Sequence, residues 1–406
     1  MPRNRTARSG YGAKTTTARL TRTALLLLLC SCASPGDDRG VGSEVEAVTL
    51  RQSLTIDAEF GEVQGLAVDA SGRIYVADAM NHAIRVFSPA GEPLGSVGRR
   101  GRGPGEFTRL QDVVVARGDS LFALDIALQR VTAYSLGDLP SLAYTTDVSS
   151  RSGGSASYSL LVPESGGFVV QYATPFASEN LDALREIVLR RVDGGGGVVT
   201  DSLLVVPDRE SLVTRSPQYG HSVSSMPFGR RPVLRLGGDD RLYYGWSDSL
   251  AVGIYSLDGK RVDRVGGEYP VHPITQADID ALLGSFSTDF SRQLHRGAID
   301  GGRVPTTKPA FKDFLVDDRG RVWVNVVTGD DTQVSSDQGL RYASRNGDGE
   351  NGGGSPWWVF DRDGNRVAEV SLPHSVALHL VRGAEAYGIE TDDLGVQRVV
   401  RYRIGD

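Results

Sequence analysis

The stretch Gln64–Val97 decides the fold of this 406-residue chain, and it reads QGLAVDASGRIYVADAMNHAIRVFSPAGEPLGSV. It contains four short segments rich in β-branched, aromatic and other apolar residues. Turn residues separate the segments, as at Ser71-Gly72, Asn81-His82 and Gly91-Glu92. Apolar runs of this length bounded by Gly, Asn, Pro and Ser are typical of β-strands joined by tight turns. The stretch therefore predicts four successive antiparallel strands in one meander sheet.

The second segment of this unit, Arg73–Asp78, recurs along the chain with similar flanks. Its counterparts are Ser120–Asp125, Gly167–Tyr172, Arg241–Trp246, Arg321–Val326 and Glu385–Glu390. Six copies of a four-strand unit predict an all-β fold, a six-bladed β-propeller. The sixth copy lacks an outer strand, and the alternating segment Val45–Leu54 is expected to supply it. Such a strand would close the ring and cover an exposed sheet edge.

Three hairpins between third and fourth strands share a turn in which glycine is expected to supply a positive φ. They are Pro89–Glu92, Leu257–Lys260 and Arg362–Asn365.

The chain resembles the NHL-like six-bladed β-propeller family of exported bacterial lipoproteins. The residues that carry this resemblance are Gly65–Asp69, Ile74–Asp78, Ala83–Phe87 and Gly101–Phe107, and it extends over about residues 48–405. The resemblance implies the fold and the exported location. Because blade motifs of this kind host many activities, function has to be argued from the site.

The N-terminus has the features of an export signal. Six basic residues and no acidic residue precede the apolar run Ala24–Leu29. The following Leu29-Cys30-Ser31-Cys32 resembles a bacterial lipobox, so we expect a lipoprotein-type signal peptide over residues 1–31 and lipidation of Cys32. Ordinary cleavage after Ala33 is the alternative. Residues 32–44 are interpreted as a tether and 45–405 as the propeller. The predicted location is the bacterial cell envelope, facing the periplasm, with the membrane as a partner through the lipid anchor.

Composition excludes several classes of protein. Hydrophobic residues make up 40% of the chain, which is enough for a sizeable core. The two cysteines, Cys30 and Cys32, lie at the edge of the leader, so no internal disulfide or Cys-ligated metal is expected in the mature chain. Without the six basic residues of the leader, 38 basic residues face 50 acidic ones. A net acidic exported protein is a poor candidate for nucleic-acid binding.

Five long segments are interpreted as loops between second and third strands or as connections between blades. All would lie at one end of the ring, here called the long-loop face, where binding usually occurs. The helical insertion about 266–310 is expected to hold two helices. The first is capped by Thr275 with Asp278 and ends near Gly284, and the second spans Ser287–Arg296. They would act as a lid or only cover loop backbone. The five segments are 137–157, 173–184, 207–231, 266–310 and 327–356.

Two groups of residues are candidates for ligand binding. Polar residues at the starts of the inner strands would form a partly cationic ring at the pore mouth, suited to a carboxylate or sugar, or else would only bind pore water. These residues are Gln64, Gln111, Arg231, Lys312 and His374. The second group lies at strand ends on the same upper face, and comprises Asp78, Asp125, Tyr172, Trp246, Asn325 and Glu390.

The strand-end carboxylates and Asn325 resemble the ligands of a calcium site in propeller lactonases. The alternative is that Asp78 and Asp125 accept hydrogen bonds from nearby turn amides. Three loop histidines could likewise converge on zinc, as in propeller amidating lyases, although no spacing requires it. The histidines considered are His82, His221, His272 and His295.

Other motifs are interpreted as structural elements rather than as catalytic or ligand-binding sites. Gly101–Phe107 lacks the Lys-Ser/Thr ending of a phosphate-binding loop and is interpreted as a linker that buries Phe107 between blades. The run Asn346–Ser355 lacks EF-hand spacing and is interpreted as a Gly-rich loop. The chain shows no Gly-x-Ser-x-Gly or His-Glu-x-x-His motif.

We therefore predict a monomeric, non-enzymatic binding module that captures a small ligand, peptide or partner protein on the long-loop face. We expect no cofactor for this binding module. Calcium and zinc are the metals that the candidate residues could bind. The alternatives are a metal-dependent hydrolase or lyase of the lactonase or amidating-lyase kind, and a purely structural envelope protein.

Overall fold

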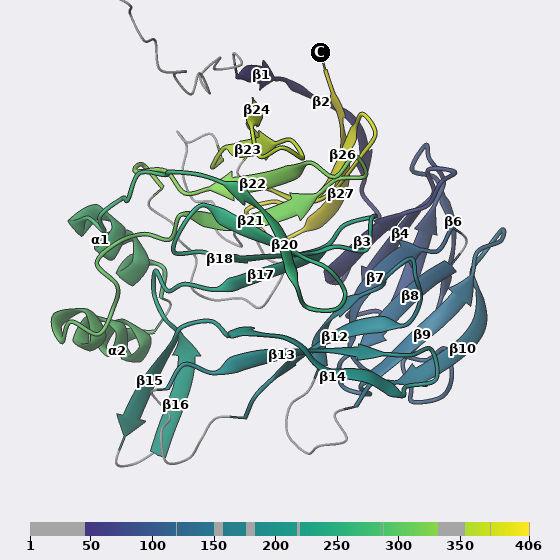
Figure 1. Cartoon of the computed structure of the whole chain (residues 1–406), viewed down its shortest axis with the longest axis horizontal. Coiled ribbons are helices and arrows are strands. Elements are labelled where there is room, and N and C mark those ends of the chain that lie inside the picture. Colours follow the sequence, from purple (N-terminus) through teal and green to yellow (C-terminus); the bar gives the residue numbers. More distant parts are fainter. Residues whose placement is uncertain are drawn as a thin grey trace, which may run out of the picture. The chain divides into compact units, whose positions relative to one another are not determined.

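Six sheets of four or five strands follow one another along the chain, and each corresponds to one predicted copy of the repeat (Figure 1). Among the described residues, a seventh sheet of two strands lies between the third and fourth of these along the chain. The computed structural model describes residues 45–118, 120–149, 157–175, 183–216, 220–286, 288–331, 354–373 and 375–405. The predicted signal peptide, Cys32, the tether, His374 and most of Asn346–Ser355 lie outside the described residues.

The first three sheets are antiparallel four-stranded meanders. Blade 1 is β3 (Val63–Val68), β4 (Ile74–Asp78), β5 (Ala83–Phe87) and β6 (Pro93–Val97). Blade 2 is β7 (Leu110–Ala116), β8 (Ser120–Asp125), β9 (Arg130–Ser135) and β10 (Ser141–Asp147). Blade 3 is β11 (Ser157–Leu161), β12 (Phe168–Ala173), β13 (Glu186–Val192) and β14 (Val198–Pro207).

The last three sheets repeat this order, with two changes at the end of the chain. Blade 4 is β17 (Pro232–Leu236), β18 (Leu242–Trp246), β19 (Ala251–Tyr255) and β20 (Arg261–Gly266). Blade 5 is β21 (Phe311–Val316), β22 (Val322–Val326), β23 (Trp357–Phe360) and β24 (Arg366–Val370), with β1 (Glu46–Val48) at its outer edge. Blade 6 is β25 (Val376–Arg382), β26 (Glu385–Thr391) and β27 (Gln397–Ile404), completed by β2 (Leu50–Ile56).

The N-terminal strand closes the ring, as predicted. β2 pairs antiparallel with β27, from Leu50 opposite Ile404 to Ile56 opposite Val399. The structure refines the expectation for Val45–Leu54, because this segment is divided between two blades. β1 pairs in parallel with β24, so the same stretch also covers the edge of blade 5.

The core is distributed between the blades. Each of six buried apolar clusters joins residues from two consecutive blades. One cluster contains Val63 and Val76 of blade 1 together with Tyr387 and Val399 of blade 6, so the last sheet packs against the first. These six interfaces establish a closed six-bladed β-propeller.

Glycines and apolar linkers behave as predicted at the turns. Gly91, Gly259 and Gly364 have φ of 84°, 82° and 83°, a region that residues with a Cβ rarely adopt. Phe107 is fully buried and packs with residues of blades 1 and 2, which confirms that Gly101–Phe107 is a blade linker.

Two helices lie between β20 and β21, as predicted. α1 (Gln276–Gly284) begins with a capping box in which the Thr275 hydroxyl and the Asp278 carboxylate each bond the other residue's backbone amide. α2 (Asp289–Asp300) starts after the N-cap Thr288, slightly later in the chain than expected. Neither of the two helices formed by the described residues is long and apolar enough to cross a membrane.

The antiparallel order of the strands places loops between second and third strands, and connections between blades, on one face. The segment 207–231 on this face carries a hairpin of β15 (Ser211–Ser216) and β16 (Gly220–Ser225). One assignment was wrong in part: 137–157 contains β10, the outer strand of blade 2. Only the part of this segment after Asp147 belongs to the long-loop face.

Candidate functional site

Three of the residues predicted at the pore mouth occupy the same structural position in their blades. The register between the two innermost strands skips one residue at Gln64 in blade 1, at Gln111 in blade 2 and at Lys312 in blade 5. Each is therefore the extra residue of a β-bulge. A bulge takes a residue out of the ladder and re-aims its side chain, which is why these polar residues recur at the starts of the inner strands.

The structure joins the described members of the predicted ring into two pairs. Gln111 Nε2 donates a hydrogen bond to Gln64 Oε1 at 3.2 Å, which links blades 1 and 2. An Nη2 hydrogen of Arg231 is donated to the backbone carbonyl of Lys312, which links blades 4 and 5.

Lys312 is neutralised by the chain itself. Its Nζ lies 3.0 Å from Asp331 Oδ1 and donates to Ser355 Oγ at 2.5 Å. Burial acts to raise the pKa of Asp331, but Lys312, Ser355 and the Thr328 amide together lower it below its usual value. Lys312 therefore helps to anchor the two described ends of the 327–356 loop.

The strand-end carboxylates Asp78 and Asp125 are fully buried and accept hydrogen bonds from backbone amides. Asp78 accepts from the amides of Gly61, Glu62 and Asn81. Asp125 accepts from those of Thr108, Arg109, Ala127 and Leu128. In both cases the carboxylate ties the turn after its own strand to the connection that leads into the inner strand of the same blade.

The other predicted upper-face residues are dispersed. Asn325 Nδ2 donates to the Ser355 carbonyl at 2.8 Å, and Tyr172 donates its hydroxyl to the Val148 carbonyl at 2.6 Å. Burial raises the pKa of Tyr172 to about 12. Trp246 and Glu390 are half-buried at the ends of β18 and β26. Within the described part of the chain, no three His, Cys, Asp or Glu side chains form a group that could hold a metal ion.

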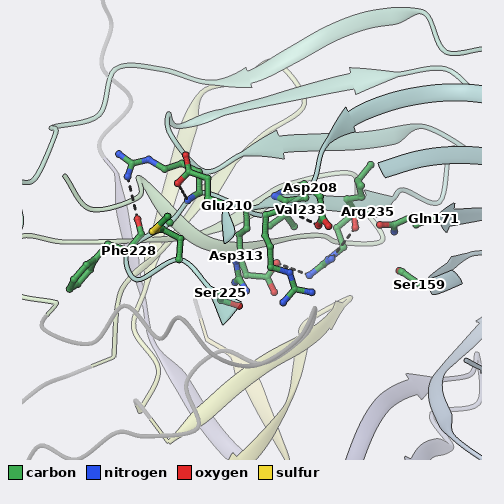
Figure 2. A pocket seen from close by; sticks show the side chains of 16 residues that line it. Ser159, Gln171, Asp208, Glu210, Ser225, Phe228, Val233, Arg235 and Asp313 are labelled. Atoms are coloured by element: carbon green, nitrogen blue, oxygen red, sulfur yellow. Dashed lines mark hydrogen bonds and ion pairs between the residues drawn. The ribbon is translucent and has the colours of Figure 1, made fainter. Parts of the chain in front are cut away.

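A pocket lies between blades 3, 4 and 5 and the connection from β14 to β17 (Figure 2). We call it the blade 3/4 pocket. Because its lining includes parts of the long segment 207–231, it belongs to the long-loop face that the sequence singles out. It is lined by Ser159, Gln171, Asp208, Arg209, Glu210, Ser225, Met226, Phe228, Gly229, Arg230, Arg231, Pro232, Val233, Leu234, Arg235 and Asp313.

Several charged groups in the lining have partners within the chain. Arg235 Nη2 lies 2.6 Å from Asp313 Oδ1, and Asp208 forms an ion pair with Arg185 behind the lining. The Glu210 carboxylate accepts from the Arg230 amide at 2.7 Å. The Arg230 guanidinium donates to the Thr307 carbonyl and hydroxyl, at 2.9 and 2.6 Å.

Arg231 and Arg209 have surroundings of a different kind. The Arg231 guanidinium donates to the Lys312 carbonyl, and among the described residues it has no carboxylate partner. Burial lowers the pKa of Arg231, with Arg235 and Arg209 acting in the same direction and Asp313 opposing them. The Arg209 backbone amide bonds to Asp208, while its guanidinium makes no hydrogen bond or ion pair to any residue that the structure describes.

Two neutral polar side chains complete the pocket. Gln171 on β12 is 4% exposed and Ser159 on β11 is 9% exposed, and both lie at the end opposite Phe228 (Figure 2). In the described parts of the chain neither the Gln171 carboxamide nor the Ser159 hydroxyl has a hydrogen-bond partner. Sequence reasoning identified Arg231 but missed these two. The sequence feature that could have revealed Gln171 is that it is a lone polar residue in a strand that is mostly apolar, Phe168–Ala173.

Comparison with known proteins agrees with this architecture. Residues 55–150 match a family model described as "6-bladed beta-propeller". The chain is a six-bladed β-propeller. No curated protein matches its sequence.

Solved structures that resemble this propeller span nearly its whole length. A Bacteroides fragilis protein predicted to be exported superposes with a TM-score of 0.50 and 13% identity, covering 91% of this chain and 98% of its own. A gluconolactonase from Xanthomonas campestris has a TM-score of 0.44 at 12% identity, covering 90% and 97%. Virginiamycin B lyase from Staphylococcus aureus has a TM-score of 0.41 at 8% identity, covering 88% and 99%. The likeness to the Bacteroides fragilis structure shows the fold, and none of the three assigns an activity to this chain.

Proposed function

We propose that this propeller is a non-enzymatic binding protein of the bacterial cell envelope that takes up a small polar ligand in the blade 3/4 pocket. The observation that carries the proposal is the pair Gln171 and Ser159. Both side chains line the pocket, and neither has a hydrogen-bond partner among the described residues. Their donors and acceptors are therefore available to a polar ligand in the pocket.

The predicted pore-mouth ring contributes to this site through Arg231. Of its four described members, Arg231 alone lines the pocket. Gln64 and Gln111 bond to each other, and Lys312 is held by Asp331 and Ser355. We place Trp246, Glu390 and the other strand-end residues outside the binding pocket.

The location rests on the leader. The basic and apolar residues before Leu29-Cys30-Ser31-Cys32 support export, and lipidation of Cys32 would tether the propeller to the membrane, facing the periplasm.

Metal-dependent hydrolysis or elimination is the alternative activity. It would need several metal-ligating side chains held together, and in the described residues Asp78 and Asp125 are occupied by backbone amides. The pocket therefore supports binding better than catalysis.

The test compares two buried glutamines in the mature protein. Gln171 lies in the pocket, whereas Gln397 is buried and accepts a hydrogen bond from the Val63 amide at 2.8 Å. The readout is the thermal unfolding midpoint, measured with and without a panel of monosaccharides, uronic acids, amino acids and dipeptides.

We expect at least one panel compound to stabilise the wild-type protein. Gln171→Leu should leave the midpoint of the free protein nearly unchanged, because it breaks no hydrogen bond within the described chain, and should abolish the ligand shift. Gln397→Leu should lower the midpoint of the free protein but keep the shift. A panel without any stabilising compound, or an undiminished shift in Gln171→Leu, would contradict the proposal.

A further inference from the structure

The four arginines that line the blade 3/4 pocket differ in what neutralises them. Arg235 is paired with Asp313, and Arg230 is held by Thr307. Arg231 has a single carbonyl partner, and the Arg209 side chain has no hydrogen-bonding or ion-pair partner in the described part of the protein. A guanidinium carries five N–H donors in a planar fork, so most of those on Arg231 and Arg209 are uncommitted. Within the described part of the chain, no carboxylate forms an ion pair with either guanidinium.

We propose that the ligand of the blade 3/4 pocket is a small organic monocarboxylate whose carboxylate is bound by Arg231, with Arg209 beside it. This inference rests on the proposed function and names the class of ligand.

The charge of the lining favours an anion. Four arginines line the pocket with the three carboxylates of Asp208, Glu210 and Asp313, and Asp208 is already paired with Arg185 behind the lining. A carboxylate would match the planar fork of a guanidinium with two parallel hydrogen bonds.

The other lining residues indicate which groups the rest of the ligand contains. Gln171 offers both a donor and an acceptor, and the Ser159 hydroxyl can act as either, so together they suit hydroxyl or amide groups. Met226, Phe228 and Val233 supply apolar contacts elsewhere in the lining.

The test uses probes that differ only in the carboxylate. D-glucuronate is compared with D-glucose, and N-acetylglycine with N-acetylglycinamide, while inorganic phosphate serves as the anion control. Affinities are measured by calorimetry, and thermal midpoints are measured on the same samples of the mature protein at constant ionic strength. The variants are Arg231→Gln and, as a matched control on the adjoining strand, Arg235→Gln.

We expect a carboxylate probe to bind at least about tenfold more tightly than its neutral counterpart and than phosphate, and Arg231→Gln to remove that preference. Arg231→Gln should lower the midpoint of the free protein only slightly, because it loses a hydrogen bond to one carbonyl and no ion pair among the described residues. Arg235→Gln should lower it, because Asp313 loses its partner. Preference for glucuronate would indicate a sugar acid, and preference for N-acetylglycine a peptide terminus.

Three results would overturn the inference: equal binding of acid and neutral probes, tighter binding of phosphate, or a fall in the free midpoint of Arg231→Gln as large as that of Arg235→Gln. Equal binding of acid and neutral probes would leave the proposed function intact. Absence of binding by every probe and every panel compound would refute both.

Discussion

Two cations next to the inner strands of blades 4 and 5 have opposite surroundings. Lys308 lies in what we call the insertion seam, formed by Asp278 of α1, Lys308 itself and the loop Gly329–Asp331. Its side chain is 1% exposed, and its Nζ contacts Asp278 Oδ1 and the carbonyls of Gly329 and Asp331 at 2.7–2.8 Å. Among the described residues, the partner of the Arg231 guanidinium in the blade 3/4 pocket is one carbonyl, with no carboxylate.

The difference distinguishes a cation that stabilises the fold from a cation that is available to a ligand. In the insertion seam the chain supplies every counter-charge, so the cation fixes the helices and the loop to the propeller. In the pocket no described carboxylate pairs with Arg231, which is the arrangement expected where a ligand completes the site. The following predictions test this contrast in order of expected effect.

The largest effect is expected at Lys308. Lys308→Met leaves Asp278 buried and unpaired, which should reduce the free energy of unfolding by about 3–5 kcal/mol. Urea unfolding measures this change. The control is Lys260→Met, because Lys260 pairs with Asp258 in a contact where both side chains are largely exposed and such pairs contribute about 0–1 kcal/mol. Equal losses in the two variants would show that the seam is not neutralised as described.

Asp331→Asn should have the next largest effect and should depend on pH. Removing a carboxylate held by Lys312 and Ser355 should cost about 1.5–3 kcal/mol at pH 7. Because the pKa of Asp331 is lowered in the folded state, its contribution is complete above the unfolded value near 4 and is lost as the pH falls below it. Unfolding curves at pH 7 and pH 3 should therefore show a smaller gap between wild type and variant at pH 3. An equal difference in unfolding free energy at pH 7 and pH 3 would contradict the lowered pKa of Asp331 in the folded state.

Thr275→Ala should have a moderate effect confined to the insertion. It removes the N-cap of α1 and half of its capping box, at a cost of about 1 kcal/mol. Hydrogen exchange should increase in the first turn of α1 while the strands of blade 1 keep their protection. The control Gln276→Ala alters an exposed side chain next to the cap and should leave exchange unchanged.

Arg209→Gln should have the smallest effect on stability. Because its guanidinium has no hydrogen-bond or ion-pair partner in the described structure, the free energy of unfolding should change by less than about 0.5 kcal/mol. Binding of a carboxylate probe should still weaken in the calorimetric assay. A destabilisation comparable to that of Thr275→Ala would mean that Arg209 supports the fold rather than the ligand.

Local patterns in the sequence determined the blades and their turns. Alternating apolar residues and glycines with positive φ act within a few residues, so segments such as Arg73–Asp78 and turns such as that at Gly91 were predictable. The cap at Thr275 was predictable for the same reason, since its partner Asp278 is three residues away. The sixth sheet lacked a strand, and this predicted that Val45–Leu54 would complete it. The segment is in fact divided between blades 5 and 6, because it pairs with strands more than 300 residues away in the sequence.

The pocket was decided by tertiary structure. Arg231 could be singled out because it precedes an inner strand, whereas Gln171, Ser159 and Asp313 resemble ordinary strand residues in the sequence. They come from blades 3 and 5, and whether each finds a partner depends on how neighbouring sheets pack. A sequence records which polar groups exist and what lies near them along the chain, but whether a buried group is satisfied depends on atoms brought close by the closure of the ring.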